Sequence, residues 1–109
     1  MSDAILLGCK HSAQAFGVMR DTAGRTCALG AAAEAIGFNP MLDGEIAINR
    51  RWPMMYDEQL IKCPVPDCDF FSPFGENPIL TPVQVLMHLN DNHRWTREEI
   101  AHWLREKGM

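Results

Sequence analysis

Two cysteines followed by two histidines constrain this chain more than any other feature of its sequence. The four residues are Cys63, Cys68, His88 and His93. Four residues separate the cysteines, nineteen separate the two pairs, and four separate the histidines. Structural zinc takes four thiolate or imidazole ligands in a tetrahedron, often with short spacings of this kind within each pair. The sequence therefore predicts one structural Zn²⁺ ion held by these four side chains.

The spacing also makes demands on local structure. His88 and His93 lie about 140° apart around an ideal helix, so the helix must end between them if both are to reach one ion. The run from Asn90 to Asn92 favours such an end, because its side chains compete for backbone hydrogen bonds. We therefore expect His88 to bind from the last helical turn and His93 from just beyond it.

Two departures from the usual pattern keep alternatives open. The nineteen-residue spacer exceeds the usual spacer of about 12–15 residues, and Pro64 and Pro66 remove two amides from the cysteine loop. Cys63 and Cys68 could instead be free thiols or a local disulfide, with both histidines at the surface. A catalytic zinc would keep one position for water, whereas four protein ligands fill the sphere. The spacing favours the structural ion over both alternatives.

Charge and composition narrow the class of protein. Of 109 residues, 47% are hydrophobic and 22% charged, which is typical of a globular domain. Ten basic and fourteen acidic residues give a net charge of -4. Because proteins that bind phosphate backbones usually present a basic face, this balance argues mildly against a nucleic-acid binder and favours a protein partner. A chain of this size has marginal stability, and a bound metal is one common remedy.

The compartment is inferred from what the sequence lacks. No apolar stretch reaches the 18 or so residues of a membrane span, so we expect no membrane association. The first eight residues have no basic leading region and too short an apolar run for a secretory signal. We therefore expect a cytoplasmic protein, in which paired cysteines near histidines bind metal more often than they form disulfides.

The first 62 residues are predicted to form a helical lobe with a short hairpin. Ser2 and the apolar spacing predict a helix over residues 2–16, and residues 18–27 predict a hairpin with its turn at residues 21–24. A second helix of small residues follows over 27–36, with Gly37 at its left-handed end.

Beyond that helix the local signals become weaker. Asn39 and Pro40 favour the start of a short helix. Trp52 precedes a proline and should end any helix before it. Residues 54–62 fit either a helix or a linker into a strand.

From residue 63 to 109 we expect a zinc-binding knuckle and two helices. Residues 63–77 predict an irregular knuckle with a possible hairpin. Thr81 and Gln84 form a capping box that starts one helix, and Thr96 and Glu99 form another that starts a helix to about residue 107. That last helix should bury one face, consisting of Ile100, Trp103 and Leu104.

Other reactive side chains have structural interpretations. Cys9 and Cys27 are expected to be small buried thiols rather than a second metal site with His11. His102 is expected to be exposed, opposite the apolar face of its helix. Three arginines alternate with glutamates near Trp95 and Trp103, and we expect them to lie on a solvent-exposed helix face. They are Arg94, Arg97 and Arg105.

Two blocks resemble a known group of proteins. They are residues 25–32, Arg-Thr-Cys-Ala-Leu-Gly-Ala-Ala, and residues 88–101, His-Leu-Asn-Asp-Asn-His-Arg-Trp-Thr-Arg-Glu-Glu-Ile-Ala. Together they resemble short hypothetical proteins of bacteriophages and prophages, which combine a Cys-Ala-Leu-Gly-Ala segment with a C-terminal Cys/His module. The cysteine spacing here is wider than the Cys-x2-Cys of some of them. Because that group has no assigned activity, the resemblance implies a phage-related origin and no mechanism.

These observations predict an α+β fold that is mostly helical, with short hairpins and a C-terminal Cys2His2-type zinc-stabilised module. Two interdependent lobes are expected, 1–62 and 63–109. The predicted function is a small, non-enzymatic protein-interaction module. The alternative is a nucleic-acid-binding regulator that reads with the helix after His93.

Overall fold

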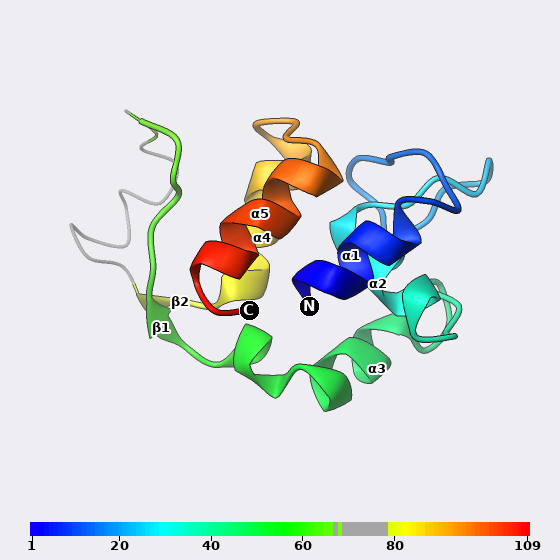
Figure 1. Ribbon diagram of the computed structural model, residues 1–109, viewed down its shortest axis with the longest axis horizontal. Coiled ribbons are helices and arrows are strands. Elements are labelled where there is room, and N and C mark those ends of the chain that lie inside the picture. The colour runs from blue at the N-terminus through cyan, green and yellow to red at the C-terminus, as the bar shows by residue number, and fades with distance from the viewer. Residues whose placement is uncertain (67, 69–78) are drawn as a thin grey trace.

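The computed structural model describes residues 1–66, 68 and 79–109, and these residues are mostly helical. The five α-helices among them are α1 (Ser2–Gly8), α2 (Ala28–Ala35), α3 (Gly44–Arg51), α4 (Pro82–Asp91) and α5 (Arg97–Glu106). A 3₁₀-helix (Pro53–Tyr56) follows α3. Two short strands, β1 (Gln59–Leu60) and β2 (Ile79–Leu80), pair antiparallel at one end of the molecule (Figure 1). The expected α+β class therefore depends on this small sheet. Most of the knuckle expected over residues 63–77 lies outside the described residues.

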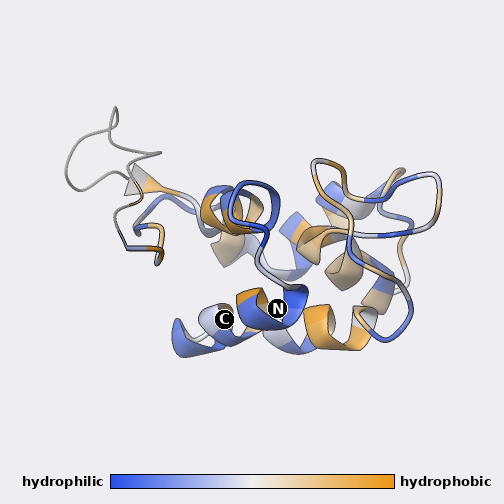
Figure 2. Cartoon of the chain, turned by 90° about the horizontal axis from the view of Figure 1, so that it is seen from above, coloured by the Kyte–Doolittle hydropathy of each residue, from blue (hydrophilic) through white to orange (hydrophobic). Residues whose placement is uncertain are grey.

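One apolar core joins elements from both halves of the chain. Helix α1 lies against α2 and α5, and the two termini are adjacent (Figure 1). Several helices carry both polar and apolar residues, as amphipathic helices around a shared core do (Figure 2). The largest fully buried apolar side chains of this core include Ile5, Ile48, Met55, Leu86, Leu89, Ile100 and Leu104. The boundary predicted at residue 62 stays a prediction.

The small residues of α2 allow α1 to approach its backbone closely. A Cβ placed on Gly8 would lie 2.1 Å from the Ala31 carbonyl oxygen, far inside any real contact. The helix predicted over 27–36 is confirmed, with Cys27 as its N-cap and Gly37 in the left-handed conformation at φ 87°.

Several expectations for the first half are wrong or only partly met. The first helix ends at Gly8 rather than Phe16, and Ser2 lies inside it instead of capping it. The predicted hairpin is reduced to a turn and one antiparallel bridge between Arg20 and Thr26. Asn39 caps a turn, by accepting from the Met41 amide at 2.9 Å, and not a helix.

The signals around the second-half helices are confirmed. Thr81 with Gln84 and Thr96 with Glu99 form complete capping boxes at the starts of α4 and α5.

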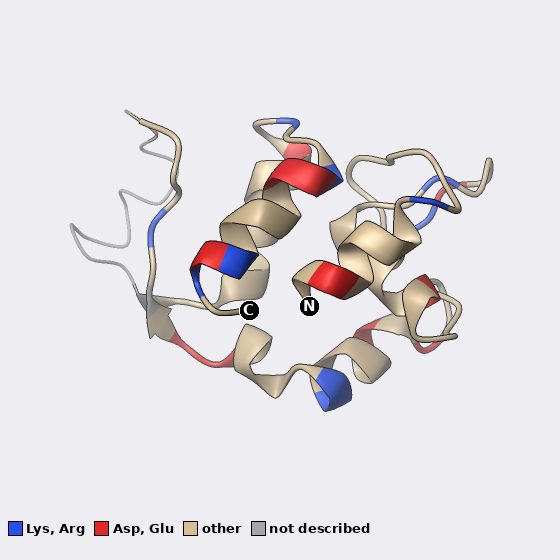
Figure 3. Ribbon diagram, viewed as in Figure 1, with Lys and Arg blue, Asp and Glu red and all other residues tan. Residues whose placement is uncertain are grey.

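Trp52 follows the last residue of α3, as the proline after it requires. Acidic residues lie in the first turns of α1 and α5 and basic residues at the end of α3, which complements the helix dipoles (Figure 3). Within the described part of the chain, every helix falls short of the length and apolar character that a membrane span requires.

Candidate metal centre

The structure brings all four predicted ligands together. The Sγ and Nε2 or Nδ1 atoms of Cys63, Cys68, His88 and His93 lie within 4.8 Å of one another. We call these four residues the Cys/His cluster. His88 is buried, and the other three are half-buried. All four cysteines of the chain are free thiols, so the local disulfide between Cys63 and Cys68 is not formed.

The end of α4 turns both histidines toward one point. The carbonyl oxygen of His88 accepts from the amides of both Asn92, at 2.9 Å, and His93, at 3.4 Å, so the last turn widens as the helix ends. Arg94 follows in the left-handed conformation, at φ 52°, which reverses the chain. His88 therefore reaches the cluster from the last turn and His93 from beyond it, as the spacing predicted.

The cysteine side is formed by the loop that follows β1. The amide of Cys68 donates to the carbonyl of Val65 at 3.3 Å, which closes a tight turn between the two cysteines. The amide of Val65, between Pro64 and Pro66, lowers the pKa of the Cys63 thiol against the larger effect of burial. Because Pro64 and Pro66 carry no amide hydrogen, the described part of the loop after Cys63 supplies the amides of Val65 and Cys68.

The distances fit a tetrahedral ion better than a set of hydrogen bonds. Cys68 Sγ lies 3.3 Å from His88 Nε2 and 3.3 Å from His93 Nε2, and Cys63 Sγ lies 3.4 Å from His93 Nε2. Tetrahedral zinc with ordinary Zn–S and Zn–N bonds would separate sulfur from nitrogen by about 3.5 Å. One ring nitrogen carries at most one proton, so His93 Nε2 cannot donate well to two sulfurs. Convergence on a common centre accounts for both contacts.

A neighbouring amide orients the first histidine. Asn92 Oδ1 lies 3.2 Å from His88 Nδ1 and can accept its proton. In that tautomer Nε2, which faces the cysteines, keeps its lone pair for a metal. We did not predict this role for Asn92, which we considered only as part of a helix end. Its position four residues after His88, one turn along the helix, is the signal that could have indicated it.

The electrostatics of the cluster favour a cation at its centre. Burial and the nearby Cys68 raise the pKa of the Cys63 thiol to about 11, although the Val65 amide opposes the rise. Burial also lowers the pKa of His88, since a second proton there would be poorly solvated. Without an ion, two thiolates this close would repel each other, whereas a divalent cation stabilises them and needs the neutral imidazole.

The remaining candidate residues lie elsewhere. Cys27 is buried, as expected, while Cys9 is only half-buried and His11 is exposed, and no other metal-binding group occurs among the described residues. His102 is exposed, as predicted. The expectation for Arg97 is wrong, because it is 5% exposed and reaches Ser12 and Thr26 instead of solvent.

Comparison with known proteins identifies no relative. No protein-family model matches the chain, and neither the curated proteins nor the solved structures include a match.

Proposed function

We propose that this protein is a small, non-enzymatic interaction module whose second half is held by one structural Zn²⁺ ion. The convergence of four ligand atoms within 4.8 Å carries the proposal. Such an ion would tie the loop after β1 to the end of α4, segments about 20–30 residues apart in the chain. A small domain with a modest core commonly gains its stability from a tie of this kind.

The donor set supports zinc over other ions. Two sulfurs and two nitrogens at tetrahedral spacing suit Zn²⁺, whereas Mg²⁺ and Ca²⁺ take oxygen ligands. A reducing cytoplasm, the compartment we propose, would keep both thiols available.

Completeness of the ligand set supports a structural role. A catalytic zinc normally keeps one of its positions for water or substrate. Here four protein side chains would fill a tetrahedron, so the ion has no vacant position at which to activate a water molecule.

The charges after His93 support a protein partner over a nucleic acid. Arg97 is buried, Arg105 donates to Asp3 at 2.7 Å, and the guanidinium of Arg94 lies 4.4 Å from the centre of the Phe16 ring. These arginines are engaged within the chain, and the net charge of -4 disfavours approach to a phosphate backbone. A phage-related origin remains compatible with either partner.

Metal analysis tests the proposal. The purified chain should contain one zinc per molecule, and Co²⁺ substituted for it should give the strong visible absorption of tetrahedral thiolate coordination. Cys63→Ser should abolish stoichiometric binding, and Cys9→Ser, a matched change outside the Cys/His cluster, should preserve it. Zinc that is absent, or equally lost from both variants, would contradict the proposal.

A further inference from the structure

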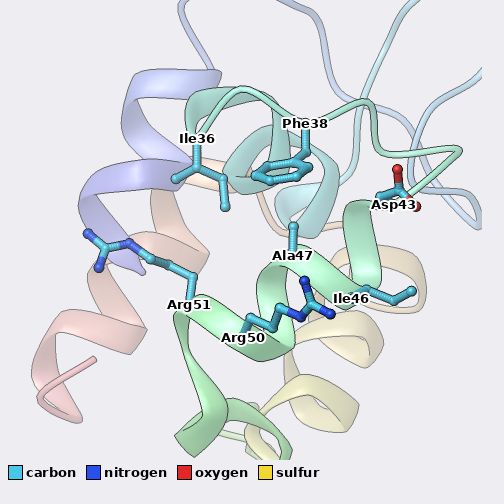
Figure 4. Close-up of a pocket in the computed structure, with 7 residues that line it drawn as sticks. All are labelled: Ile36, Phe38, Asp43, Ile46, Ala47, Arg50 and Arg51. Carbon is cyan, nitrogen blue, oxygen red and sulfur yellow. The ribbon is translucent and has the colours of Figure 1, made fainter.

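A cleft on the opposite half of the molecule has no role in the metal site. It has a volume of about 670 Å³ and lies between the end of α2 and the outer face of α3. Its lining consists of Ile36, Phe38, Asp43, Ile46, Ala47, Arg50 and Arg51. Figure 4 shows Ile36 and Phe38 over one side and α3 along the other, with the two arginines projecting from α3. The size falls in the range of ligand sites, roughly 300–1,000 Å³, but this cleft is open along α3.

Exposed apolar side chains line this cleft and also occur in the segment that joins its two sides. Leu42 is 77% exposed, Met41 61% and Ile46 55%, and Phe38 is also exposed. All four lie within nine residues of one another, between the end of α2 and the first turns of α3. Single exposed apolar residues are ordinary, whereas a contiguous group of this kind marks an interaction surface. Because Met41 and Leu42 lie outside the lining, an occupant confined to the cleft would leave them in water.

Two basic side chains at the C-terminal end of α3 lack an ion-pair partner among the described residues, although the Arg51 guanidinium lies 5.8 Å from the centre of the Trp52 ring. These side chains, Arg50 and Arg51, are both exposed. Arg51 also lies near the Met1 ammonium: burial lowers the pKa of that group, the Asp3 carboxylate raises it, and the Arg51 guanidinium lowers it further. Basic residues in the last turn of a helix complement its dipole, but that role does not explain the apolar side chains beside them. The acidic residues of this segment, Asp43 and Glu45, lie at the start of α3, so the charges along the helix run from acidic to basic.

From this juxtaposition we propose that the α2–α3 surface, Ile36 to Arg51, docks an amphipathic helix of a partner protein that carries acidic residues beside its apolar face. The proposal rests on the interaction function above and names its surface. Apolar residues at helical spacing would cover Phe38, Met41 and Ile46, and carboxylates at one end would pair with Arg50 and Arg51. The eight residues of α3 span about 12 Å, so roughly two turns of the partner helix would lie along it. Asp43, at the other end, would disfavour acidic residues there and so orient the helix.

A designed pair of peptides tests the proposal on the zinc-loaded chain. One 16-residue helical peptide carries leucines at i, i+3, i+4 and i+7 with two glutamates at one end of that face. The control peptide has lysines in place of those glutamates. Fluorescence anisotropy of the labelled peptides should show at least tenfold tighter binding of the glutamate peptide, with an affinity that falls as salt rises.

Surface variants identify where the peptide binds. Ile46→Asp, and the double change Arg50→Glu with Arg51→Glu, should each weaken binding of the glutamate peptide at least tenfold. Leu7→Asp and Lys10→Glu, matched changes at exposed positions of α1 and the turn after it, should leave binding within twofold. All of these sites are exposed, so each variant should fold, and a circular-dichroism spectrum and melting transition like those of the wild-type chain confirm that it has.

Three results would overturn the assignment while leaving the metal site intact. The first is equal binding of both peptides, or binding that no α2–α3 variant weakens. The second is a dimer in sedimentation experiments that Ile46→Asp dissociates, which would make a second copy the occupant. The third is displacement of the glutamate peptide by dodecanoate at stoichiometric concentration, which would make the site one for a small lipophilic anion. A chain that lacks zinc would instead contradict the metal-stabilised function.

Discussion

Helix α4 is anchored on two sides, and the anchors differ in kind. On one side His88 faces the Cys/His cluster. Two residues later, and about 200° around the helix, Asn90 faces the loop between α1 and α2, residues 9–27. Its amide group contacts Gln14 at 3.1 Å, the Ala15 carbonyl at 3.0 Å and the Ala28 amide at 3.3 Å. His88 is 5% exposed and Asn90 1%, so each side chain anchors a buried contact between distant segments.

The difference lies in what completes each contact. On the Asn90 side the protein itself supplies the partners of the Asn90 amide group. Arg97 adds hydrogen bonds to Ser12 and Thr26 from the start of α5, while its Nε atom is buried without a partner among the described residues. On the His88 side the four ligand atoms lie within 4.8 Å of one another, and the metal ion that we propose would complete the contact. The first contact therefore depends on folding alone, while the second, if our proposal holds, would depend on metal supply as well. The comparison predicts that the two sides respond independently to metal removal and to mutation.

Metal removal should produce the largest effect, and only on one side. Structural zinc in small peptides contributes an apparent free energy of about 10–16 kcal/mol. A strong chelator should therefore lower the melting temperature sharply and expose residues 59–68 to rapid amide exchange. Amides of residues 13–33, behind Asn90, should stay protected. Hydrogen exchange followed by mass spectrometry checks this, and equal loss of protection in both regions would refute the independence of the two sides.

Arg97→Met should produce the next largest effect, on the other side. It removes a buried guanidinium and the charged hydrogen bonds that this group donates to the Ser12 carbonyl and the Thr26 hydroxyl, so the free energy of unfolding should fall by about 3 kcal/mol. Zinc content should remain one per chain. Denaturant titration measures the loss.

Arg105→Met is the control for that change. It breaks an exposed ion pair with Asp3 and should cost less than about 1 kcal/mol. Equal losses in the two variants would show that the buried network contributes no more than a surface pair.

Asn92→Ala should weaken the metal side by a smaller amount. The change removes the oxygen that orients His88, and loss of such partners typically lowers metal affinity about 10–100-fold, or roughly 1.4–2.7 kcal/mol. Competition with a chromophoric chelator measures the affinity. Asn39→Ala removes an asparagine that caps an exposed turn and should leave the affinity unchanged. Wild-type affinity in Asn92→Ala would argue that the hydrogen bond does not set the ring position.

Acidification should produce the smallest of these effects, a modest loss of stability in the metal-free chain. Burial holds the pKa of His88 below the usual 6.5 in the folded state, so the unfolded chain binds the proton more readily. Stability should therefore fall as the pH drops below 6.5, visible as a lower urea midpoint at pH 5.5 than at pH 7.5. In the zinc-loaded chain the same protons compete with the ion for Nε2, so metal release should accompany the fall. A midpoint that rises on acidification would contradict the burial argument.

Local signals predicted the second half of the fold better than the first. Each capping box lies within four residues of chain, so Thr81 and Thr96 could be identified from their neighbours alone. The helix expected over residues 2–16 ends early although its apolar spacing continues. Gln14 and Ala15 instead contact Asn90, 75 or more residues away, and no local pattern carries that information.

The sequence by itself determined which four side chains could hold an ion and where α4 and α5 begin. Residue chemistry and short spacings set both, since ligand type and helix caps act over one or two turns. Only the tertiary structure decided that Asn92 orients His88, that Arg97 is buried, and that apolar residues gather beside Arg50 and Arg51. Each of these depends on which segments lie next to one another in the folded chain. The shared core determines that arrangement, because it is formed by contacts between residues far apart in the sequence.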